Sequence, residues 1–98
     1  MTKFYNRRDY EWIERIALGG KILSSCYNHN YYQNAKTGEV VLEECDDCDG
    51  FDYYRISEDG QEHYIGSLYC SGGIFPWKGD LPDDVTEEED GSVELYDE

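Results

Sequence analysis

The sequence has few basic residues, and this scarcity is its strongest global feature. Lysine and arginine together number 8, against 23 aspartates and glutamates, which gives 98 residues a formal net charge of -15. Nucleic acids and anionic membranes would repel such a chain, so direct binding to either polyanion is excluded. The charge favours a basic protein as partner, although high acidity can also serve solubility alone.

Long hydrophobic runs are also lacking. No stretch approaches the roughly 20 apolar residues of a membrane-spanning helix, and residues 1–4 lack the apolar stretch that begins a secretory signal. We therefore expect a cytoplasmic protein. In that reducing compartment the four cysteines are expected to be thiols or metal ligands rather than disulfides.

Histidine is scarce, and no catalytic signature is present. His29 and His63 are the two histidines, and no motif positions either of them as a general acid or base. The glycine pairs at 19–20 and 72–73 lack the spacing and the basic residues of a phosphate-binding loop. We therefore predict that the protein is not an enzyme.

What the sequence does contain is a series of strand and turn signals between Lys21 and Cys70. Turns are predicted at residues 35–38, 46–50 and 58–61, each with a glycine where a positive φ is needed. The runs between these turns are rich in aromatic and β-branched residues, which is typical of strands. The pattern predicts a four-stranded antiparallel meander.

The turns also predict a register. A first hairpin centred on Thr37 places His29 opposite Cys45 and Cys26 opposite Cys48. A second hairpin centred on residues 59–60 forms three pairs: Phe51 with Leu68, Tyr54 with Ile65, and Ile56 with His63.

Strand alternation leaves aromatic residues on both faces of this sheet. Phe51 and Tyr53 are expected on one face, and Tyr54 and Ile56 on the other. Residues 74–77 are expected to pack back on the sheet. A face that no other segment covers would present a tyrosine-rich patch to a partner.

A helix is predicted before the meander. Asn6 is a suitable cap, and apolar residues recur at helical spacing at Tyr10, Ile13, Ile16 and Ala17. Glycines 19–20 would end the helix. We expect its apolar stripe to cover one face of the sheet, which makes the predicted fold class α+β.

The composition changes sharply at residue 79. Residues 79–98 hold ten acids and no base, whereas residues 1–78 hold 13 acids and 8 bases. We therefore expect a single small domain at 1–78 followed by an acidic C-terminal segment. Such a composition is typical of disorder, but residues 92–96 alternate like a strand, so the segment is a candidate for a short edge strand. It is also a candidate partner for two arginines, Arg7 and Arg8.

A cysteine cluster raises the question of metal binding. Residues 45–50 have the C-x-x-C-x-G form of a zinc knuckle. In the predicted meander all four cysteines lie at one rim of the sheet, so the candidate zinc ligands are Cys26, Cys45, Cys48 and Cys70. A pairing of Cys26 with His29 would need a bulge. Reduced thiols without any cofactor are the alternative, because the neighbouring aspartates oppose thiolate formation.

The leading functional hypothesis rests on the acidic surface. Carboxylates on strands and on the tail can imitate the negative charge of a nucleic-acid backbone, and interleaved tyrosines can act as binding hot spots. This predicts a non-enzymatic binding or inhibitor protein that engages a basic, nucleic-acid-binding protein as a DNA mimic. The acidic surface around the central turn comprises Glu43, Glu44, Asp46, Asp47, Asp49 and Asp52. The predicted contacts are Asp83, Asp84, Glu87, Glu88, Glu89 and Asp90, then Asp46, Asp47 and Asp49.

In kind, this profile is similar to the inhibitors that phages and mobile elements use against nucleic-acid-handling enzymes, and to immunity proteins that neutralise nuclease toxins. The likeness is one of composition and carries no site residues across. The alternative is a small zinc-stabilised structural or adaptor module built on the cysteine rim, whose acidity serves solubility alone.

Overall fold

The computed structural model of the chain describes residues 2–4, 6–13, 16–17, 21–22, 29–46, 50–68, 73–75, 81 and 85–96. These residues form strands and one short 3-10 turn, with no α-helix among them. The elements are β1 (Thr2–Phe4), η1 (Arg7–Asp9), β2 (Tyr10–Ile13), β3 (Ile16–Ala17), β4 (Lys21–Ile22), β5 (His29–Asn34), β6 (Val40–Asp46), β7 (Gly50–Ile56), β8 (Glu62–Leu68) and β9 (Val93–Leu95).

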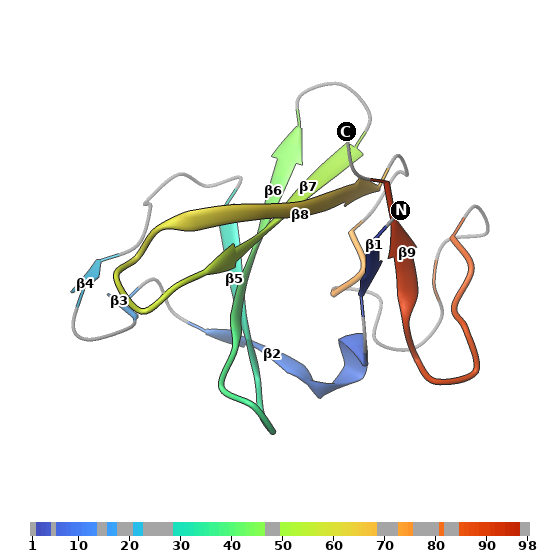
Figure 1. Ribbon diagram of the computed structural model, residues 1–98, viewed down its shortest axis with the longest axis horizontal. Coiled ribbons are helices and arrows are strands. Elements are labelled where there is room, and N and C mark those ends of the chain that lie inside the picture. Colours follow the sequence, from blue (N-terminus) through green and yellow to red (C-terminus); the bar gives the residue numbers. More distant parts are fainter. Residues whose placement is uncertain are drawn as a thin grey trace.

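The main sheet has five antiparallel strands in the order β2-β5-β6-β7-β8 (Figure 1). Two smaller sheets pair β1 with β9 and β3 with β4. The part of the chain that the structure describes contains no helix long and apolar enough to span a membrane.

The predicted N-terminal helix is wrong, and with it the α+β fold class. Asn6 adopts a left-handed conformation (φ 50°) and makes no side-chain cap, and the 3-10 turn gives way to β2 at Tyr10. Tyr10 and Trp12 pair with Asn34 and Tyr32 of β5. Aromatic and β-branched residues favour extended backbone, and pairing along the edge of a sheet outweighs a short run of helical spacing. The predicted end of the helix at 19–20 lies outside the described residues.

The first hairpin is shifted by one residue from the predicted register. Its loop has four residues, closed by a hydrogen bond from the N–H of Asn34 to the carbonyl of Glu39, and Gly38 supplies the positive φ of 80°. The Asn34 side chain accepts hydrogen bonds from two loop N–H groups. As a result His29 faces Glu44 rather than Cys45. A one-residue shift moves a side chain to the other face of its strand.

The second hairpin matches the prediction at one end only. Phe51 pairs with Leu68 as expected, but between the β-bulge beside Tyr53 and Tyr54 and the turn the register differs by one residue. The predicted pairs of Tyr54 with Ile65 and of Ile56 with His63 are therefore wrong. The observed pairs are Tyr54 with Tyr64 and Ile56 with Glu62. The turn has a three-residue loop, closed by a hydrogen bond from the N–H of Ser57 to the carbonyl of Gln61, instead of the predicted two-residue loop. The extra residue of the bulge then restores the predicted register farther from the turn.

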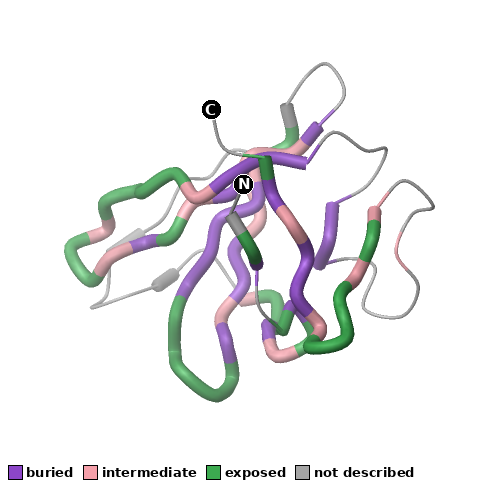
Figure 2. Tube along the Cα trace, turned by 45° about the vertical axis from the view of Figure 1, so that its right-hand side comes forward, coloured by how far each residue is buried: buried purple, intermediate pink, exposed green. Residues whose placement is uncertain are grey.

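The two faces of the sheet carry separate clusters of buried residues, as the alternation predicted. Tyr53 belongs to the larger cluster, and Phe51 packs against it. Ile56 belongs to the smaller one, and Tyr54 packs against that. Buried residues run through the middle of the strands, while the hairpin ends are exposed (Figure 2).

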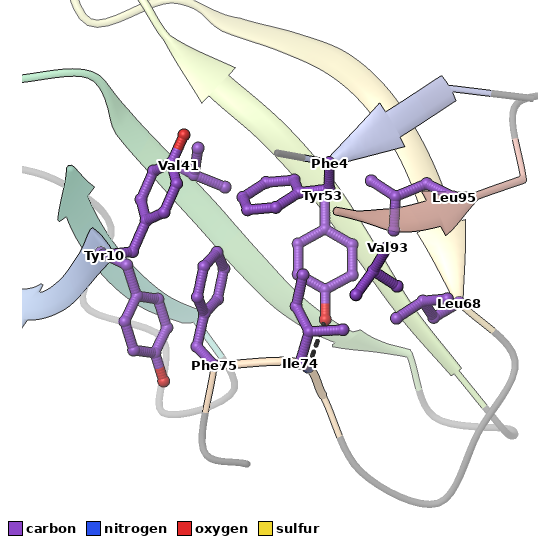
Figure 3. Packing of buried hydrophobic residues seen from close by; sticks show 10 residues of the cluster. Phe4, Tyr10, Val41, Tyr53, Leu68, Ile74, Phe75, Val93 and Leu95 are labelled. Carbon is purple, nitrogen blue, oxygen red and sulfur yellow. Dashed lines mark hydrogen bonds between the residues drawn. The ribbon is translucent and has the colours of Figure 1, made fainter. Parts of the chain in front are cut away.

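The larger cluster is rich in aromatic rings (Figure 3). Phe75 stacks on Tyr32 with ring centroids 4.2 Å apart, and it contacts Phe4 and Tyr10 at 5.1 Å and 5.3 Å. Such ring pairs add stabilisation beyond their buried area. The expected packing of residues 74–77 on the sheet is thus confirmed for residues 74 and 75; the other two lie outside the described residues.

The acidic C-terminal segment covers the same face. Val93 and Leu95 of β9 are 1% and 0% exposed, and β9 pairs with β1 beside the main sheet (Figure 1). Tyr96 then bridges to Ser67 of β8 through two backbone hydrogen bonds of 2.6 Å and 2.8 Å. The strand predicted at 92–96 is therefore present, with β1 as its partner.

Candidate functional site

Three of the predicted contact residues, Glu88, Glu89 and Asp90, are exposed on a turn that precedes β9. Backbone hydrogen bonds join Gly91 to Glu88 (3.0 Å) and Glu88 to Ser92 (2.8 Å). Asp90 Oδ1 accepts hydrogen bonds from the N–H and hydroxyl of Ser92 at 3.0 Å and 2.6 Å. These hydrogen bonds lower the pKa of Asp90. We call residues 87–90 the acidic turn.

Two arginines hold the acidic turn against the start of the chain. Arg7 is 1% exposed and its Nε donates to Glu87 Oε2 at 2.7 Å, while Arg8 donates to Oε1 of the same carboxylate at 3.0 Å. A Cβ on Gly91 would lie 3.0 Å from Asn6 Oδ1, so the two turns are in close contact. The acidic segment thus partners both arginines, as the sequence suggested, and Glu87 acts within the fold.

The remaining predicted contacts are only partly placed. Asp46 ends β6, where its backbone pairs with Gly50; its side chain is not described. Four others lie outside the described residues: Asp47, Asp49, Asp83 and Asp84.

Glu43 was expected on the acidic surface, and this is wrong, because its side chain is only 2% exposed. The Tyr53 hydroxyl donates to Glu43 Oε2 at 2.6 Å, and the backbone of Ile74 and Phe75 hydrogen bonds to the same carboxylate. The Ile74 N–H also donates to the Tyr53 hydroxyl at 3.0 Å (Figure 3). A Cβ on Gly73 would collide with the Glu43 carboxylate, which explains the glycine there.

Burial raises the pKa of Glu43 to about 7, because an ionised carboxylate loses its hydration inside the protein. The hydrogen bonds from Tyr53 and from residues 74 and 75 oppose this rise. The alternation of side chains along the strand could have predicted that Glu43 is buried, because Glu43 shares a face with Val41 and pairs with Tyr53 on the neighbouring strand.

The cysteine cluster is only partly described. Cys45 is exposed on β6, and the other three candidates for zinc, Cys26, Cys48 and Cys70, lie outside the described residues. His29 Nε2 lies 3.1 Å from Glu44 Oε2. Within the described ranges, no group of three or more cysteine, histidine or acidic side chains is placed to hold a metal ion.

The hydroxyl and histidine side chains at the second hairpin turn form local contacts. His63 is exposed on β8, and its Nε2 lies 3.2 Å from Ser57 Oγ. Ser57 also contacts Asp59 within the same turn. These contacts stabilise the turn that joins β7 to β8. A catalytic serine and histidine need a third group that orients the histidine, and among the described contacts no buried group does so for His63.

An open hollow lies between β1, η1 and the two hairpin turns. Its rim includes the cations Lys3 and Arg55 and the acids Glu39 and Glu58. The Tyr10 hydroxyl donates to Glu39 Oε1 there at 2.7 Å. Because charges of both signs line it, the hollow does not concentrate the field of either sign.

Exposed aromatic residues are a further feature. Sequence analysis predicted a tyrosine-rich patch on an uncovered face but did not identify which residues form it. Among the described residues, the exposed large hydrophobic side chains are Trp12 (59%), Tyr64 (40%) and Tyr96 (52%). The Tyr64 hydroxyl of β8 lies 3.3 Å from the backbone carbonyl of Tyr96, 32 positions farther along the chain. Sequence reasoning missed this pair because the backbone bridge between Ser67 and Tyr96 brings the two segments together.

Comparison of the chain with protein-family models, with curated proteins and with solved structures finds no significant match.

Proposed function

We propose that this protein is a non-enzymatic acidic binding protein that engages a basic, nucleic-acid-binding protein by mimicking nucleic-acid charge. The observation that carries the proposal is the anchoring of the acidic turn. Glu88, Glu89 and Asp90 are exposed, yet the chain on both sides of them is fixed by Glu87 and by Val93.

Fixed carboxylates make a better mimic than a mobile tail. A mobile tail loses conformational entropy on binding, whereas a turn that is already ordered avoids most of that cost. A protein that binds phosphates through lysine and arginine would accept carboxylates held at fixed spacing. The net charge of -15 adds long-range attraction that speeds association with a basic partner.

The test compares two double variants of equal net charge. Glu88→Lys with Glu89→Lys reverses the acidic turn, and Glu11→Lys with Glu58→Lys reverses two exposed acids elsewhere. Each tagged protein captures partners from a lysate of its native host at low salt, followed by a salt gradient and mass spectrometry.

We expect the wild type and the Glu11/Glu58 variant to retain a basic nucleic-acid-binding protein that moderate salt releases and duplex DNA displaces. The Glu88/Glu89 variant should lose it. Retention by both variants, or no salt-sensitive partner at all, would reject the proposal. Zinc measured in the same preparation, at about one ion per chain with unfolding by chelator, would instead support the zinc-stabilised module.

A further inference from the structure

Two tyrosine rings are in contact at the β7–β8 edge, and the backbone of a third tyrosine meets one of them. Tyr54 and Tyr64 are paired across the strands with ring centroids 5.7 Å apart and nearly perpendicular planes. The Tyr64 hydroxyl lies 3.3 Å from the carbonyl of Tyr96, at the point where the chain leaves β9 beside β8 (Figure 1). Tyr64 and Tyr96 are 40% and 52% exposed. We call these three residues the tyrosine surface.

Carboxylates lie near Tyr54 of the tyrosine surface. Burial raises the pKa of Tyr54, and the nearby charges of Glu44, Asp52 and Glu62 raise it further. Asp52 accepts a hydrogen bond from Ser67 Oγ at 2.5 Å, and that oxygen lies 2.5 Å from the Tyr64 hydroxyl. Asp52 and the paired rings of Tyr54 and Tyr64 are therefore connected through Ser67.

The arrangement of these acids is unfavourable by itself. Glu44 and Asp52 are direct cross-strand partners, and like charges in that position destabilise a sheet. His29 contacts Glu44 on its far side at 3.1 Å. A cation bound between the rings and the carboxylates would relieve the repulsion that remains.

We infer that the tyrosine surface, with the carboxylates of Asp52 and Glu62, binds arginine side chains of an arginine-rich segment on the partner protein. The inference rests on the proposed function and identifies a second contact region in addition to the acidic turn. A guanidinium group stacks flat on a tyrosine ring and donates two parallel hydrogen bonds to a carboxylate. An ammonium group is a hydrated point charge that does neither as well. Charge complementarity excludes a nucleic acid as occupant of this surface.

The test uses fluorescently labelled octa-arginine and octa-lysine peptides, titrated with the full-length protein and followed by anisotropy at low and moderate salt. We expect octa-arginine to bind about tenfold more tightly than octa-lysine, and to keep part of its affinity at moderate salt. Equal affinities of the wild type for the two peptides would overturn the inference, without any variant being needed.

Tyr64→Leu with Tyr96→Leu, and Tyr96→Leu alone, remove rings while retaining apolar side chains. We expect the double variant to lower the affinity for octa-arginine by about tenfold and to remove the preference over octa-lysine, with a smaller loss for the single variant. Circular dichroism reports whether each variant is folded. Unchanged arginine preference in a folded variant would reject the tyrosine surface.

The variants also separate this inference from the proposed function. Capture of the native partner that depends on Glu88 and Glu89 but not on Tyr64 and Tyr96 would reject the tyrosine surface and leave the proposed function standing. Capture that depends on neither pair would reject both. Capture that depends on both pairs, together with arginine preference, is the result we expect.

Discussion

At the scale of single residues, Glu43 makes the stability of this fold depend on pH near neutrality. Its folded pKa of about 7 lies above the ordinary glutamate value of 4.5, so the native state retains a proton that the unfolded chain has lost. The stabilisation from this group is therefore complete below pH 4.5, the unfolded pKa, and is lost as the pH rises through about 7, the folded pKa. The shift corresponds to about 3 kcal/mol across that window.

We therefore predict that Glu43→Gln reduces the pH dependence of the free energy of unfolding between about pH 4.5 and about pH 7. Glutamine has no proton to lose in this range and fits the same cavity. Urea unfolding followed by fluorescence at several pH values measures the effect. Glu58→Gln, at an exposed turn, is the matched control and should keep the wild-type slope. A Glu43→Gln slope equal to that of the wild type would contradict the prediction.

Arg7 gives a second prediction at this scale. Its guanidinium is 1% exposed and donates to Glu87 at 2.7 Å, so neutralising Glu87 weakens the pairing of a buried charge. We expect Glu87→Gln to lower the free energy of unfolding by about 2 kcal/mol. Glu88→Gln on the exposed part of the same turn should change it by less than about 0.5 kcal/mol. Equal losses from both variants in urea unfolding would show that the arginine contact contributes little.

At the scale of elements, the packing of β9 depends on Gly66 in β8. Gly66 has φ 152°, and a Cβ there would lie 2.5 Å from Leu95 Cβ. The absence of a side chain lets β9 lie directly on β8, so this one glycine helps to determine where the acidic turn is held. The bulge beside Tyr54 lies in the same part of the hairpin.

We predict that Gly66→Ala destabilises the protein by about 2 kcal/mol through this clash and increases amide hydrogen exchange in β9 selectively. Gly38→Ala is the control, because Gly38 also has a positive φ but nothing within 4 Å of its Cβ position. It should cost about 1 kcal/mol through backbone strain and leave β9 protected. Hydrogen exchange measured by mass spectrometry distinguishes the two, and uniform exchange in both variants would refute the role given to Gly66.

At the scale of the whole molecule, the net charge of -15 opposes the compact state through self-repulsion. We predict that sodium chloride raises the thermal midpoint of the wild type by several degrees as it screens this repulsion. The Glu11→Lys, Glu58→Lys variant carries less charge and should respond less. A fall in the midpoint with salt would mean that the attractive ion pairs, including Arg7 with Glu87, outweigh the repulsion.

The sequence by itself predicted the features that depend on neighbours along the chain. Glycines at 38 and 60 indicated the two hairpin turns, and strand alternation separated Tyr53 from Tyr54. The net charge and the concentration of acids after residue 79 also follow directly from the sequence. Turn chemistry and strand parity are local, so no knowledge of distant contacts was needed.

Only the tertiary structure decided the rest. It showed that residues 10–13 form a strand, because β5 supplies partners that helical spacing cannot reveal. It placed Glu43 in the interior, where residues 74 and 75 satisfy it, and it brought Tyr96 beside Tyr64. Each of these outcomes depends on contact between segments far apart in sequence, and hydrophobic burial and backbone pairing across such distances are not encoded in any local pattern.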